Sequence, residues 1–125
     1  MTPDWTEDQP IYRQLRDKVV DAIMDGSLKE GEPLPSVRTV AVELRINPIT
    51  ASKAYQELVG EQLVEKRRGL GMFVVEGARG RLLEAERRRF MEQEWPKVLE
   101  RMKKLELDAR ELLKTVTNGN AGGAQ

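Results

Sequence analysis

Two helix start signals stand eleven residues apart in the middle of the chain, and this spacing constrains the fold more than any other feature. Pro35-Ser36 provides a serine N-cap, and Asn47-Pro48 provides a second cap with proline at the first helical position. The first of the two helices is therefore short, about nine residues, because a tight turn at Arg45-Ile46 must precede the second start. A short helix, a tight turn and another helix predict a helix-turn-helix motif.

Periodic apolar residues predict the helices that complete this motif. Upstream, a helix follows Gln9-Pro10 and ends at Gly26, a left-handed C-cap. Its apolar face is Ile11, Leu15, Val19, Ala22 and Ile23. The helix after Asn47 is predicted to reach about Gln62. Its core face is Ala51, Ala54, Tyr55 and Leu58.

A β-hairpin is predicted next. Leu63-Val64 and Phe73 to Val75 read as two strands around a tip, in which Gly69 and Gly71 accept the positive φ that a tight turn needs. The predicted fold is mainly α with a small β-hairpin. It is a winged helix-turn-helix domain at 10–77, followed by a short two-helix dimerisation region at 78–116 and a disordered tail at 117–125.

The outward face of the third helix carries small polar side chains and one lysine. Thr50, Ser52, Lys53, Gln56 and Glu57 lie outside its core face. A helix enters the major groove of DNA only if bulky side chains do not block it, and Thr, Ser and Lys can bond to bases or phosphates. The N-terminus capped by Asn47 adds a partial positive charge that suits a phosphate. The alternative is an ordinary solvated helix face.

Cations stand at two further places. Arg38 lies in the first turn after the Ser36 cap, where the helix macrodipole disfavours a cation unless a phosphate or base lies in front of it. At the hairpin tip, Lys66, Arg67 and Arg68 repel one another, and an anionic partner relieves that repulsion. The alternatives are a solvent-exposed arginine and a solubilising charged turn.

The chain becomes highly charged and helix-forming from about residue 78. Trp95-Pro96 is predicted to break or kink the first helix there, because a residue before proline avoids the α region. Apolar residues then step by three and four along a second helix, which could pack on its own chain, form a dimer interface or line a ligand pocket. We expect dimerisation through Leu82, Phe90, Trp95, Leu99, Met102, Leu105 and Leu112.

Composition excludes several functions. The chain has no histidine and no cysteine, so the familiar catalytic triads, disulfides and the commonest transition-metal ligands are missing, and no enzyme or cofactor is predicted. No apolar run is long enough to span a membrane, and the acidic N-terminus is no signal peptide, so we expect a cytoplasmic protein. Net charge is zero, but residues 35–71 hold six basic against four acidic residues, which permits phosphate contact.

Several motifs together resemble the DNA-binding domain of the GntR superfamily of bacterial transcription regulators. They are Pro10-Ile11-Tyr12, the Gly26 to Gly31 loop, Leu34-Pro35-Ser36-Val37-Arg38, Asn47-Pro48 with Thr50, Ala54-Tyr55-Gln56-Glu57-Leu58 and Gly69-Leu70-Gly71. The short tail after them is similar to the YtrA-like subfamily, which dimerises through two helices.

The resemblance implies a homodimeric regulator, usually a repressor, that binds double-stranded DNA at an inverted-repeat operator, often beside transporter genes. It assigns DNA contacts to Ser36 and Arg38, to Thr50, Ser52 and Lys53, and to the glycine-containing wing tip. Two alternatives stay open. They are a winged helix used for protein contact, and a sensor with an unknown small-molecule effector between the C-terminal helices.

Overall fold

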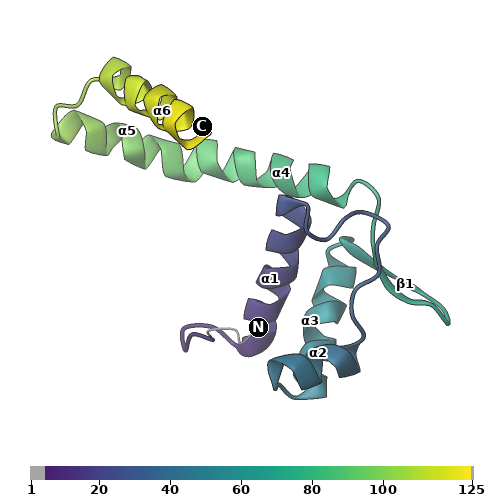
Figure 1. Ribbon diagram of the computed structural model, residues 1–125. Coiled ribbons are helices and arrows are strands. Elements are labelled where there is room, and N and C mark those ends of the chain that lie inside the picture. Colours follow the sequence, from purple (N-terminus) through teal and green to yellow (C-terminus); the bar gives the residue numbers. More distant parts are fainter. Residues whose placement is uncertain (1–4, 125) are drawn as a thin grey trace. The chain divides into compact units, whose positions relative to one another are not determined.

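The computed structural model describes residues 5–124, with side chains described for residues 5–117. The chain divides into two compact units, Met1–Glu84 and Ala85–Gln125, and each is described by itself. The first unit holds α1 (Ile11–Asp25), α2 (Val37–Leu44), α3 (Pro48–Gly60), β1 (Val64–Arg67) and β2 (Gly71–Val74) (Figure 1). α4 (Ala78–Arg89) begins in this unit and ends in the second one. The fold is therefore mainly helical with one two-stranded hairpin among the described residues, as predicted.

The predicted helix caps at Gly26, Ser36 and Asn47 are confirmed. α1 ends at Gly26, whose φ of 87° is the left-handed conformation that glycine adopts without steric cost. The Ser36 side chain accepts a hydrogen bond from the Thr39 N–H and caps α2. Asn47 caps α3 through the Ile49 N–H. Between these two helices, Arg45 takes a left-handed φ of 55°, and this residue makes the tight turn.

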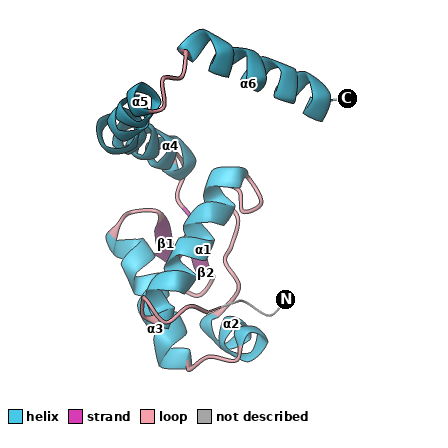
Figure 2. Ribbon diagram, turned by 90° about the vertical axis from the view of Figure 1, so that its left-hand side faces the viewer, coloured by secondary structure: helices cyan, strands magenta, loops and turns pink. Residues whose placement is uncertain are grey.

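α3 is the central helix of the first unit. It packs on α1 and α2 and contacts β1, and Figure 2 shows the hairpin in magenta with these helices. The predicted core face is confirmed, because Ala51, Ala54 and Leu58 have no exposed surface and Tyr55 is 2% exposed. The helix ends at Gly60 rather than at about Gln62. Gln62 has a φ of 62°, which turns the chain directly into the hairpin.

Tyr55 joins the core to the start of α2, because its hydroxyl donates a hydrogen bond of 2.7 Å to the Pro35 carbonyl. Burial raises the pKa of this phenol to about 12. The folded state therefore holds the proton more tightly than the unfolded chain does. The resulting stability is complete below the unfolded pKa of about 10 and is lost as the pH rises through 12.

We expect Tyr55→Phe to lower the free energy of unfolding at pH 7 by roughly 0.5–1.5 kcal/mol, the usual net value of one hydrogen bond. The variant should also lose stability less steeply than the wild type between pH 10 and 12. Urea unfolding followed by circular dichroism across that pH range measures both effects. Parallel pH profiles for the two proteins would show that Tyr55 is not the titrating group.

The hairpin strands differ from the prediction. β1 and β2 pair from Val64↔Val74 out to Arg67↔Gly71, so pairing extends beyond the apolar residues that predicted it. Only residues 68–70 form the tip, because the ladder hydrogen bonds continue through charged residues whose side chains stay in solvent. β2 is joined to the loop before α2, since the Leu34 N–H donates to the Met72 carbonyl at 2.8 Å.

The first turn of α4 is fastened to the rest of the first unit. The Glu30 carboxylate accepts a hydrogen bond from the Arg79 N–H at 3.1 Å, and the Gly77 and Arg79 N–H groups lower the pKa of Glu30. The Arg79 guanidinium donates to the Met24 carbonyl at 2.8 Å, and Arg81 donates to the Gln62 carbonyl. α4 is thus attached to the ends of α1 and α3 by side chains of its own first turn.

The second unit contains η1 (Phe90–Glu94), α5 (Trp95–Lys104) and α6 (Ala109–Ala124). Trp95-Pro96 was predicted to break or kink the helix, and the break is wrong. α4 continues through the π-helical turn η1 into α5, and the Trp95 N–H bonds to the Phe90 carbonyl five residues back. The wider π turn accommodates the proline without ending the helix.

The break falls further along the chain, between α5 and α6. Glu106 has a φ of 54°, and the Asp108 carboxylate caps α6 by accepting from the Arg110 N–H at 2.8 Å. The apolar residues predicted on one helix are therefore divided between two. α6 also continues to Ala124, into the segment predicted to be a disordered tail, and Gln125 lies outside the described residues.

Candidate nucleic-acid interface

The outward face of α3 is the centre of the candidate interface. Opposite the buried face, Lys53 and Gln56 are exposed, whereas Thr50 and Ser52 are half-buried at its edges. The structure adds Ile49 to this face, with 77% of its surface exposed. Residues 49, 53 and 56 follow one another at helical spacing and form one strip that a groove can receive.

The lysine on this face is held by an aromatic ring. Lys53 Nζ lies 4.1 Å from the centre of the Tyr12 ring on α1, within the range of a cation–π interaction. This contact limits the positions of the ammonium group while leaving Lys53 exposed. The cation is therefore pre-positioned beside the N-terminal half of α3.

The N-terminal residues of α2 and α3 combine capping with exposure. The Asn47 side-chain oxygen Oδ1 accepts from the Ile49 N–H at 2.8 Å, and Ser36 Oγ accepts from the Thr39 N–H at 3.0 Å. Ser36 Oγ also donates to the Thr39 hydroxyl at 2.9 Å. Both side chains thus cap the N-terminus of their helix. Arg38 is exposed and makes no hydrogen bond or ion pair with a described residue, so its guanidinium is available to an anion.

The two arginines of the hairpin differ in their surroundings. Arg67 donates to the Glu65 carboxylate at 3.1 and 3.3 Å and stacks 4.3 Å from the centre of the Phe73 ring. Arg68 is exposed and makes no such contact among the described residues. At the tip, Gly69 and Gly71 have φ of 77° and 113°, as predicted, and Leu70 between them is 71% exposed. Arg68, with Leu70 beside it, is therefore a free cation of the wing. Lys66 is another, because it is exposed and makes no hydrogen bond or ion pair with a described residue.

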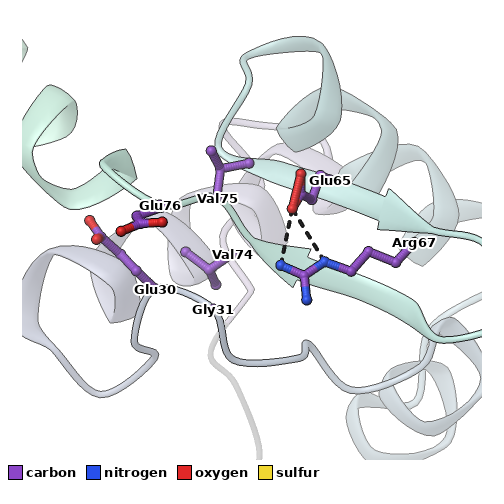
Figure 3. A pocket seen from close by; sticks show the side chains of 7 residues that line it. All are labelled: Glu30, Gly31, Glu65, Arg67, Val74, Val75 and Glu76. Carbon is purple, nitrogen blue, oxygen red and sulfur yellow. Dashed lines mark hydrogen bonds and ion pairs between the residues drawn. The ribbon is translucent and has the colours of Figure 1, made fainter.

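A hollow beside the hairpin carries three carboxylates and does not extend the interface. The hollow, of about 470 Å³, is lined by Glu30, Gly31, Glu65, Arg67, Val74, Val75 and Glu76 (Figure 3). Its one cation is already paired with Glu65, as the dashed lines show. Phosphate groups are repelled by the remaining carboxylates. No group of three acidic side chains suited to a metal ion occurs within the described part of the chain.

The residues predicted for dimerisation lie in both units. Leu82 is half-buried and packs against the core of the first unit, and its assignment to a dimer interface stays a prediction. Phe90 and Trp95 stack with ring centres 6.3 Å apart. In the second unit, an apolar groove of about 230 Å³ is lined by Val98, Arg101, Met102, Leu105, Leu107 and Leu112. Leu99 lies outside this groove and is 40% exposed.

The fold and the distribution of cations define a winged helix-turn-helix domain of the DNA-binding type. Residues 11–74 match the model of the bacterial regulatory proteins of the gntR family. The chain belongs to this family, and it is a transcription regulator rather than an enzyme. In the part of the chain that the structure describes, no helix is both long and apolar enough to traverse a bilayer.

The chain is similar to individual regulators in sequence or in fold. The chain is 39% identical over 84 residues to the HTH-type transcriptional repressor YtrA of Bacillus subtilis, covering 67% of this chain and 65% of YtrA. A transcriptional regulator from Oenococcus oeni has a similar structure, with a TM-score of 0.71, 27% identity and coverage of 93% and 95%. AraR(DBD), solved in complex with operator ORE1, shares the fold with a TM-score of 0.53 at 24% identity, over 60% of this chain and 93% of that one.

Two exposed residues of the interface were not predicted from the sequence. Ile49 and Leu70 are apolar, whereas the residues predicted to contact DNA are polar or charged, apart from the glycines of the wing tip. The signal for Ile49 was present, because position 49 lies opposite 51, 54, 55 and 58 on a helical wheel. For Leu70 the signal was an apolar residue between two glycines in a charged turn.

Proposed function

We propose that the chain is a repressor that binds an inverted-repeat operator as a homodimer. The observation that carries this proposal is the exposed strip of α3, with its cation at Lys53, together with the exposed cations Arg38 at the start of α2 and Arg68 in the wing. Hydrogen bonding joins the wing to the loop before α2, so all three segments belong to one framework. The name of YtrA and the operator complex of AraR(DBD) support a role of this kind.

In the proposed complex α3 enters the major groove and reads base edges with Lys53, Gln56 and its first turn. Arg38 contacts a base or a phosphate from the start of α2. Arg68 and the glycines of the tip contact the adjacent backbone or minor groove. The site of action is the cytoplasm, where bacterial promoter DNA is found.

Dimerisation is proposed through the apolar groove between α5 and α6. Its lining includes Met102, Leu105 and Leu112, which the sequence predicted for this role. At about 230 Å³ the groove is smaller than the roughly 300–1,000 Å³ of usual small-molecule pockets. A second copy of the same two helices, with the same apolar residues, is the occupant that matches it.

The salt dependence of DNA binding tests the proposed function. Operator fragments are selected from random duplexes with the full chain, and their affinity is measured by fluorescence anisotropy at several salt concentrations. A DNA reader loses affinity linearly on a logarithmic plot, with a slope of about −0.9 per phosphate contacted. Arg68→Ala should make that slope shallower by about 0.9, the value for one phosphate contact. Arg67→Ala should change the slope less, because Arg67 is already paired with Glu65. A weak affinity that depends neither on the salt concentration nor on the DNA sequence would refute the proposal.

Arg38→Ala is expected to weaken operator binding by roughly 1–3 kcal/mol, the value of a lost arginine–base contact. The measurement is the dissociation constant at fixed salt, with the fold checked by circular dichroism. Lys29→Ala is the matched control, because it also removes one exposed cation and lies in the loop after α1, outside the three proposed segments. Equal affinities for wild type and Arg38→Ala would remove Arg38 from the interface.

A further inference from the structure

Ile49 has an environment that packing within the chain does not explain. It is the most exposed large apolar side chain among the described residues, at 77%, although isoleucine is ordinarily buried. Every helix of the first unit has apolar residues available for its core, and α3 supplies Ala51, Ala54, Tyr55 and Leu58 for that purpose. Ile49 therefore contributes little to the stability of the folded chain.

The position of Ile49 is nevertheless well defined. It is the second residue of α3, after Pro48, and its N–H is bound by the Asn47 side chain at 2.8 Å. Its β-branched side chain has few rotamers in a helix. The first turn of a recognition helix is the part that contacts base edges. Ile49 is thus a rigid apolar group at the end of α3 that is expected to contact bases.

Its neighbours identify the ligand. Lys53 and Gln56 share the outward face with Ile49, and these side chains bond to guanine and adenine edges. An isoleucine forms no hydrogen bond. The only apolar group that base pairs present in the major groove is the C5 methyl of thymine. Contact between the Ile49 side chain and that methyl group removes the apolar surface of both groups from water.

We propose that Ile49 is a specificity residue that recognises the C5 methyl group of a thymine in each half-site. This inference rests on the proposed function and deepens it, because it assigns one base of the operator to one side chain. It also distinguishes Ile49 from Thr50, which has a methyl group but is half-buried at the edge of the same face.

Deoxyuridine provides the test, because it lacks the methyl group of thymidine and keeps its hydrogen bonds. Operator duplexes selected with the full chain are remade with each thymine replaced in turn by deoxyuridine. At one position in each half-site the wild type should lose affinity by about fourfold, the factor that corresponds to burial of one methyl group. Ile49→Ala should bind the thymine operator more weakly and should not distinguish thymine from deoxyuridine at that position.

Two control variants complete the design. Ile49→Val keeps a branched apolar side chain and should retain part of the discrimination. Val42→Ala removes apolar surface from a side chain on α2 that is 73% exposed, and it should discriminate like the wild type. Since these side chains are largely exposed, the variants are expected to fold, and circular dichroism verifies this.

The outcomes separate the two proposals. If no duplex is selected, both the proposed function and the role of Ile49 are overturned. If an operator is bound with salt-dependent affinity but no deoxyuridine substitution weakens it, only the role of Ile49 is overturned. The same conclusion follows if Ile49→Ala keeps the full discrimination, because another side chain then reads the methyl group.

Discussion

Leu112→Asp is expected to lower the affinity for an inverted-repeat operator by roughly 10²–10⁴-fold, the range by which linking two binding modules exceeds a single one. Leu112 is half-buried in the apolar groove between α5 and α6, where we propose that the second copy packs. A carboxylate at this position must be desolvated when the groove is covered, which is costly without a partner. Affinity for an isolated half-site should remain unchanged, since one winged helix suffices for it.

Analytical ultracentrifugation and anisotropy titrations on full and half operators measure the two effects together. Thr117→Asp is the matched control, because it introduces the same charge on α6 at an exposed position. It should remain dimeric and bind like the wild type. A Leu112→Asp chain that stays dimeric would place the interface elsewhere. A monomeric variant with undiminished operator affinity would show that dimerisation does not contribute to binding.

The features predicted correctly from the sequence depend on local interactions. Gly26, Ser36 and Asn47 end or begin helices through hydrogen bonds to residues within a few positions, so the residue types alone identify them. The buried face of α3 follows from helical periodicity, which is equally local. Together these signals were sufficient to predict the helix-turn-helix and the helix that reads DNA in the proposed complex.

The features that were missed depend on distant residues or on competing local preferences. The ring contacts of Lys53 with Tyr12 and of Arg67 with Phe73 join separate elements, so spacing along the chain does not reveal them. At Trp95 the preference against helix before proline is overcome by a π turn, which keeps the helix hydrogen-bonded. The real break at Glu106 lacks the glycine or proline that would have marked it.

Leu58→Ala is expected to lower the free energy of unfolding by roughly 2–5 kcal/mol, a large part of the total for a small domain. Leu58 has no exposed surface and lies in the core where α3 meets the base of the hairpin, so its loss leaves a cavity. Urea unfolding measures the effect. Val59→Ala is the control, since Val59 is the adjacent residue of the same helix but is 37% exposed, and it should cost much less. Similar costs for the two variants would contradict the central place of α3 in the core. If Leu58 acts only through stability, operator affinity per folded molecule should be the same for Leu58→Ala as for the wild type.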